Sequence, residues 1–101
     1  FGSDTPVERP DSFAGWAAAF TRIDENGQPI GGWQPQEAIT REAAWWAFTG
    51  GAAYAGFAEK RFGSLEPGHM ADFLLIDRDI SAANPAEDAD SAGLLLIPKC
   101  V

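Results

Sequence analysis

Apolar residues recur at a helical spacing early in the chain. Four of them follow the pattern i, i+3, i+4 and i+7, namely Phe13, Trp16, Ala17 and Phe20. This spacing places them on one face of a helix. Ser12 comes just before the pattern and is the expected N-cap, and the helix should end near Arg22. The stretch 21–35 is rich in turn residues and is predicted to be a loop.

A second helix is predicted after Thr40, which is a good N-cap. Its apolar stripe consists of Ala44, Trp45, Phe48 and Ala52. Glycine in a helix interior costs about 1 kcal/mol relative to alanine. The pair Gly50-Gly51 is therefore expected to break or kink the helix, with a further helical turn or two over residues 52–60.

The remaining pattern is that of strands and loops. Glu66-Pro67-Gly68 is typical of a type II turn, because Pro sets φ at the first central position and Gly accepts a positive φ at the second. Short extended runs are predicted on either side, at 62–65 and 70–76. Residues 82–91 read as a loop, and residues 94–97 as a last strand.

Trp45 and Trp46 are adjacent in the second predicted helix. Neighbouring helical side chains point about 100° apart, so these two rings cannot both face one core. Either the helix is buried on two sides, or one of the two tryptophans faces something outside this chain.

Composition and charge narrow the classes of function. The chain has 101 residues, with 15 acidic and 7 basic side chains and a net charge of −8. Such a charge repels phosphate backbones and anionic lipids, so neither nucleic acid nor a membrane is an expected partner. One cysteine and one histidine exclude an intrachain disulfide and a Cys/His zinc site built from this chain alone. No signal peptide is visible, and a cytoplasmic location is expected.

Three blocks of sequence resemble the C-terminal end of metal-dependent amidohydrolases, in particular the amidohydrolase-3 (YtcJ-like) family. The first is Phe1-Gly2-Ser3-Asp4-Thr5-Pro6-Val7, and the second is Thr40-Arg41-Glu42-Ala43-Ala44 with its continuation to Ala55. The third and most specific runs from Gly63-Ser64-Leu65-Glu66-Pro67-Gly68 to Asp77. The blocks occur in the order and spacing of the family and cover the chain as far as about residue 79.

The resemblance implies an α/β fold of which this chain is the C-terminal portion. Residues 1–61 would be the end of the last strand of a (β/α)₈ barrel and the helices that follow it. Residues 62–101 would be return strands of a small β-sandwich, with an atypical tail from about residue 88. As an isolated chain, the expected structure is a small α+β piece.

The resemblance also implies the chemistry, which is hydrolysis of non-peptide carbon–nitrogen bonds of a small-molecule substrate by a metal-activated water. Asp4 would be both a metal ligand and the group that takes a proton from the water. The metal expected in the full-length enzyme is divalent, most simply zinc. The histidine ligands of the family are absent here, so the isolated chain is expected to hold no stoichiometric metal and to be inactive. His69 stands where the family usually has lysine and is interpreted as a surface residue.

Two alternatives remain beside this interpretation. From the residues alone, without the resemblance, Asp4 reads as an Asx-turn or N-cap residue ahead of Thr5-Pro6. The whole chain could also be a non-catalytic acidic module for interaction or self-association. The apolar helix faces that would pack on a barrel are exposed when the chain is isolated, so a homo-oligomer is expected.

Overall fold

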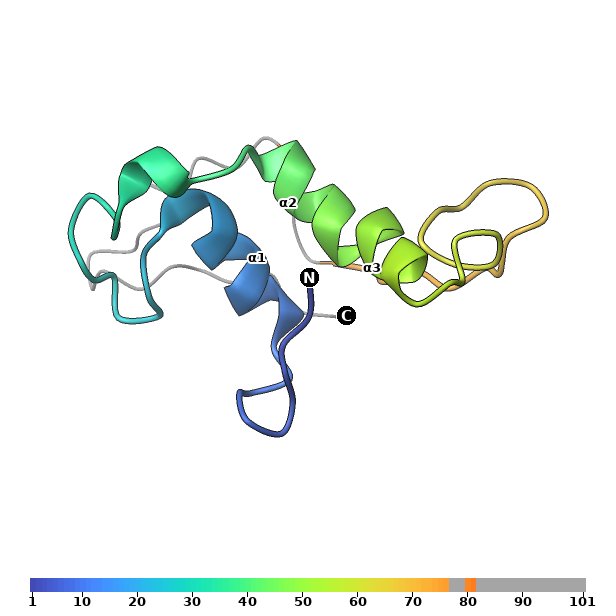
Figure 1. The fold of residues 1–101 in the computed structure, drawn as a ribbon, viewed down its shortest axis with the longest axis horizontal. Helices are drawn as coiled ribbons and strands as arrows, with labels where there is room; N and C mark the ends of the chain where they lie inside the picture. Colours follow the sequence, from blue (N-terminus) through green and yellow to red (C-terminus); the bar gives the residue numbers. More distant parts are fainter. Residues whose placement is uncertain (77–79, 82–101) are drawn as a thin grey trace.

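The computed structural model describes residues 1–76 and 80–81, and within them the regular elements are all helical (Figure 1). Their order along the chain is α1 (Ser12–Thr21), a 3₁₀ turn η1 (Pro35–Glu37), α2 (Arg41–Phe48) and α3 (Gly50–Ala55). In the view of Figure 1, α2 and α3 follow one another, and α1 lies beside α2. The last predicted strand, at 94–97, and the predicted loop at 82–91 lie outside the described residues.

Helix α1 forms where the apolar pattern predicts it, but its N-cap is Asp11 and not Ser12. One carboxylate oxygen of Asp11 accepts hydrogen bonds from the backbone N–H groups of Phe13 and Ala14, both at 3.1 Å. A carboxylate satisfies two orphan N–H groups at a helix start and also favours the positive end of the helix dipole. The helix ends as expected at Arg22, which has a left-handed conformation.

The connection between α1 and η1 is irregular, as predicted, and is tied back to the end of α1. The N–H of Trp33 donates to the carbonyl of Arg22 at 2.8 Å, and Nε of Arg22 donates to the carbonyl of Trp33 at 3.0 Å. The guanidinium of Arg22 also lies 5.1 Å from the centre of the Trp33 ring system. These contacts close residues 22–33 into a loop with a fixed base.

Helix α2 begins as predicted, because Oγ1 of Thr40 accepts from the N–H of Ala43 at 3.1 Å. The predicted break occurs one residue early, at Thr49, and the two glycines open α3 instead of interrupting it. The indole of Trp46 lies over them: a Cβ on Gly50 would come within 2.9 Å of its Nε1, and one on Gly51 within 2.8 Å of its Cζ3. The glycines therefore make room for the ring. Helix α3 ends at Ala55, short of the expected residue 60.

The buried core lies between α1 and α2. Trp16, Ala17 and Ala44 are its buried apolar members, with six partly buried residues packed on them: Phe13, Ala19, Phe20, Ile39, Phe48 and Ile80. All four residues of the predicted α1 face thus belong to this core. Trp16 meets Phe20 edge to face, with ring centroids 4.7 Å apart.

The type II turn forms, but the strands expected beside it do not. His69 N–H donates to the Glu66 carbonyl at 3.0 Å, and Gly68 has φ +97°. Among the described residues, Ile76 alone forms an isolated β-bridge and none lies in a strand. This part of the chain is therefore helical, and not the α+β piece that was expected. The run at 62–65 fails as a strand because Gly63, at φ +90°, turns the chain against α3. A Cβ at Gly63 would lie 3.0 Å from the Cα of Gly50.

Candidate functional site

Asp4, the predicted site residue, lies in a turn ahead of α1. Its carbonyl accepts from the N–H groups of Val7 and Glu8, at 2.9 and 3.4 Å, and its own backbone is left-handed with φ 56°. Aspartate is one of the few non-glycine residues that tolerate this conformation. The turn is therefore built from the backbone of Asp4.

The carboxylate of Asp4 takes no part in that turn. The residue is exposed, and within the described part of the chain its side chain has no hydrogen bond or ion pair. This arrangement is neither an Asx-turn nor an N-cap, since in both of these the carboxylate would accept from a backbone N–H. The next aspartate along the chain, Asp11, does the capping. Asp4 thus presents a charged group that local structure does not use.

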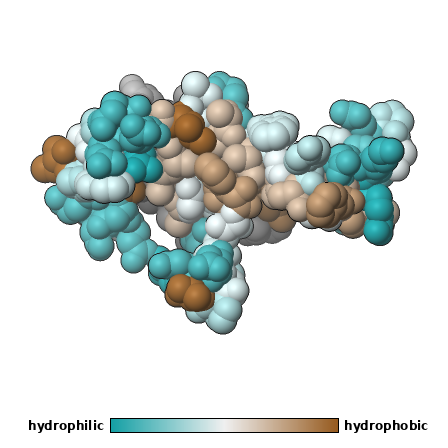
Figure 2. Space-filling model, viewed as in Figure 1, coloured by the Kyte–Doolittle hydropathy of each residue, from teal (hydrophilic) through white to brown (hydrophobic). Residues whose placement is uncertain are grey.

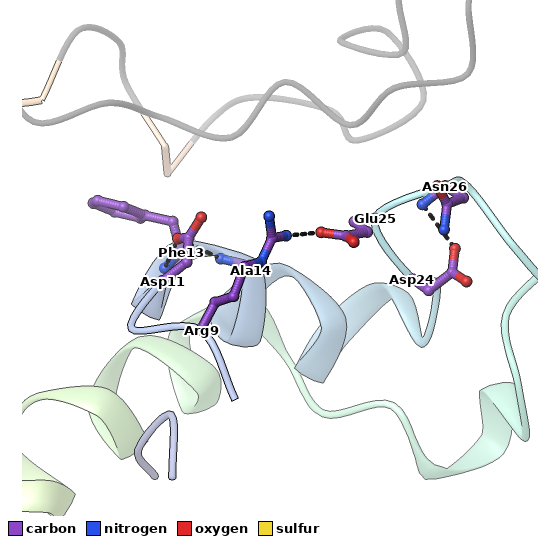
Figure 3. A network of polar contacts seen from close by, with 7 residues as sticks. All are labelled: Arg9, Asp11, Phe13, Ala14, Asp24, Glu25 and Asn26. Atoms are coloured by element: carbon purple, nitrogen blue, oxygen red, sulfur yellow. Dashed lines mark hydrogen bonds and ion pairs between the residues drawn. The ribbon is translucent and has the colours of Figure 1, made fainter. Parts of the chain in front are cut away.

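Five other charged residues line a pocket of about 350 Å³ beside α1. Its walls come from the N-terminal segment, α1 and residues 23–25, and its charged members are Glu8, Arg9, Asp11, Asp24 and Glu25. Figure 3 shows the Arg9 side chain extending to Glu25, with which it forms an ion pair. Asp4 is not among the lining residues, so this pocket does not extend the predicted site.

Asp24 also lines this pocket, and its carboxylate holds the loop that follows it. One oxygen accepts from the N–H of Asn26 at 2.8 Å (Figure 3). The same oxygen accepts from the N–H of Gln28, also at 2.8 Å. These bonds stabilise the ionised form and hold the pKa of Asp24 below its ordinary value of 3.8. The bond from Gln28 has the larger effect. The carboxylate is committed to its loop, which makes it a structural group.

His69 lies elsewhere, in the turn after α3. It is half-buried and not fully exposed, and its Nδ1 is 2.7 Å from the hydroxyl oxygen of Ser64. The contact ties the two ends of the loop 64–69 together. Whichever of the two atoms donates, one ring nitrogen of His69 is engaged within its own turn.

The described residues do not by themselves fit a metal ion. A catalytic zinc takes about three protein ligands and a water. In residues 1–76 and 80–81, no three His, Cys, Asp or Glu side chains come together in an arrangement that could hold a metal. Asp4 has the right donor atoms for one ligand position, and a complete site would require further ligands.

The sequence did not point to one residue whose side chain could bind a ligand. Arg41 opens α2, and its guanidinium lies against the aromatic core and beside a second pocket. The adjacent tryptophans were the available signal, because they predicted either a helix buried on two sides or one ring that faces something outside this chain. They did not indicate a cation beside it.

Comparison with known proteins identifies the family. The sequence model described as the amidohydrolase family matches residues 1–97, so the chain belongs to that family of hydrolases. Its members are generally metal-dependent and have a TIM-barrel-related fold. The described residues of this chain form a small helical piece. No curated protein and no solved structure gave a significant match. In the described part of the chain, no helix has the length and apolar character needed to cross a membrane.

Proposed function

We propose that this chain is part of a metal-dependent hydrolase of non-peptide carbon–nitrogen bonds, in which Asp4 is both a metal ligand and the proton acceptor. The observation that carries the proposal is the Asp4 carboxylate, which is exposed and unpaired among the described residues. Membership of the amidohydrolase family supports the class of reaction.

The proposed reaction requires only that the carboxylate of Asp4 is accessible and held in a fixed place. A carboxylate that is free of local hydrogen bonds can accept a proton from an attacking water and release it later to the leaving amine. A divalent metal, when bound, would lower the pKa of that water. The left-handed turn fixes the backbone of Asp4 through the N–H groups of Val7 and Glu8. The carboxylate therefore projects from a defined position.

The division of the chain follows from the same proposal. Residues 1–61 correspond to the end of the last barrel strand and its helices, and residues 62–101 to strands of the small sandwich. The helices α1, α2 and α3 all fall within the first part. The family subtype is proposed to be YtcJ-like. With one candidate ligand in the described region, the chain by itself is proposed to be inactive.

Zinc retention in an active, zinc-loaded enzyme that contains this sequence tests the role of Asp4 as a ligand. Asp4→Asn should lose zinc to a competing chelator at a lower chelator concentration than the parent protein. Asp72→Asn is the matched control, since Asp72 is also exposed and its substitution removes the same charge. Equal retention of zinc by the two variants would remove Asp4 from the ligand set.

A non-catalytic module for self-association is the second candidate, and it is favoured by exposed aromatic surface. Trp46, Tyr54 and Phe57 have 62%, 68% and 95% of their surface exposed. Figure 2 shows hydrophobic residues over the helices at the centre of the molecule and mostly hydrophilic residues at its two ends. Contiguous apolar surface of this kind marks an interaction site. Activity in any preparation of the chain, lost in Asp4→Asn, would decide against this candidate.

A further inference from the structure

A second pocket, of about 440 Å³, lies between α1, the start of α2 and the segment after the Pro–Gly turn. Its apolar walls are the side chains of Trp16, Trp45, Leu74, Ile76 and Ile80. Trp16 and Trp45 meet edge to face, with centroids 6.5 Å apart. This volume lies within the range of about 300–1,000 Å³ typical of small-molecule sites, which are mostly apolar with a few placed polar groups.

Arg41 supplies the placed polar group. Its guanidinium lies 5.9 Å from the Trp16 ring and 4.8 Å from the Phe20 ring, and Nη1 donates to the carbonyl of Ile80 at 3.0 Å. These three contacts hold the cation in place at the pocket wall. Among the described residues, no carboxylate forms an ion pair with it. A guanidinium has five N–H donors, and within the described residues the hydrogen bond to Ile80 uses one of them.

We propose that this pocket binds an organic anion, a carboxylate attached to an aromatic or aliphatic body. The apolar body would lie against Trp16 and Trp45, and the carboxylate would pair with Arg41. Arginine suits this role because its planar fork matches a carboxylate in two hydrogen bonds and stays charged. Glu42 also lines the pocket, and its negative charge limits the affinity.

The site is separate from the one proposed for hydrolysis. None of its lining residues comes from the first 15 residues, and Asp4 is not among them. A ligand here would bind whether or not the chain takes part in catalysis. Failure of one proposal therefore leaves the other intact.

Binding of 4-phenylbutyrate, compared with its neutral amide 4-phenylbutanamide, tests the proposal on the 101-residue chain. The readout is the four indole N–H signals in a ¹H–¹⁵N spectrum, each assigned with a Trp→Phe variant. The acid should shift the signals of Trp16 and Trp45 and leave those of Trp33 and Trp46 in place. The amide should bind at least tenfold more weakly, because it lacks the charge that Arg41 recognises.

Two arginine variants locate the charge. Arg41→Gln should weaken binding of the acid at least tenfold and leave the weak binding of the amide unchanged. Arg22→Gln is the matched control, since Arg22 also lies over a tryptophan, Trp33, but outside this pocket. It should bind the acid like the parent protein.

A third variant keeps the test decisive if Arg41→Gln does not fold. Glu42→Gln removes the opposing charge and should tighten binding of the acid at least threefold without affecting the amide. The proposal is overturned if acid and amide bind equally well, if all four indole signals shift alike, or if Glu42→Gln leaves the affinity for the acid unchanged.

Discussion

The indole rings of Trp16 and Trp45 meet at 86°, with their centroids 6.5 Å apart, and this contact joins α1 to α2. Trp16 is 6% exposed, whereas Trp45 keeps 45% of its surface in solvent. Trp46, the next residue, points away from this contact and lies over Gly50 and Gly51. The pair of adjacent tryptophans is thus divided, with one ring against the core and one against the glycines of α3.

Replacement of Asp11 tests the start of α1. Asp11→Ala removes the oxygen that accepts from Phe13 and Ala14 and should lower the free energy of unfolding by about 1 kcal/mol. Ser12→Ala is the control and should have a much smaller effect, since Ser12 is the first helical residue and not the cap. Urea unfolding midpoints compare the two. Equal losses in both variants would contradict the assignment of the cap.

Gly68→Ala tests the Pro–Gly turn. At φ +97° a Cβ is strained, although it would meet no atom within 4 Å, so the cost is conformational alone. We expect a loss of about 1 kcal/mol in the free energy of unfolding. Gly2→Ala is a suitable comparison, because its Cβ also meets nothing and its φ is not in the positive region. A neutral Gly68→Ala would show that the turn has another form.

The loop around Asp24 should respond to acid. The N–H groups of Gln28 and Asn26 lower the pKa of Asp24 from its ordinary value of 3.8. The ionised carboxylate therefore stabilises the folded loop fully above pH 3.8, and this stabilisation is lost as the pH falls through the lower pKa of the folded state. The amide signals of Asn26 and Gln28 should therefore titrate together with a midpoint below 3.8. Asp24→Asn keeps an acceptor oxygen but cannot ionise, so this titration should disappear. A midpoint at or above 3.8 would contradict the account.

Self-association is expected from the exposed apolar side chains of α2, α3 and the segment after the turn. Light scattering at tens of micromolar should give a multiple of the chain mass of 10.8 kDa. Trp46→Gln combined with Phe57→Gln should shift the distribution toward the single chain, since both side chains are exposed. A mass of 10.8 kDa for the unmodified chain would refute the expectation.

The helices were predictable from local pattern because their determinants are local. The α1 face and the Thr40 cap depend on residues within one or two turns, and both were confirmed. The cap of α1 was misplaced by one residue because Asp11 and Ser12 are both good caps, and only the geometry chooses between them.

The strands and the site depended on partners distant in sequence. A run such as 70–76 becomes a strand only when another strand supplies its hydrogen bonds, and sequence pattern alone does not show whether one does. Asp4 became a candidate through the resemblance alone. Its carboxylate is unpaired among the described residues, which could not be predicted, since nothing local distinguishes it from a turn-forming aspartate. The position of Arg41 over Trp16 and Phe20 likewise joins α1 and α2, which no single stretch reveals.

The turnover number of an Asp4→Asn variant tests the central claim most directly. In an active enzyme that contains this sequence, asparagine keeps the size of the side chain but removes its charge and its ability to accept the proton. If Asp4 is the proton acceptor, kcat should fall by at least about 10²-fold, the lower range for loss of a general base. Asp72→Asn should turn over at the parent rate. An Asp4→Asn enzyme with near-parent kcat would contradict the account, because Asp4 would then have no part in the reaction.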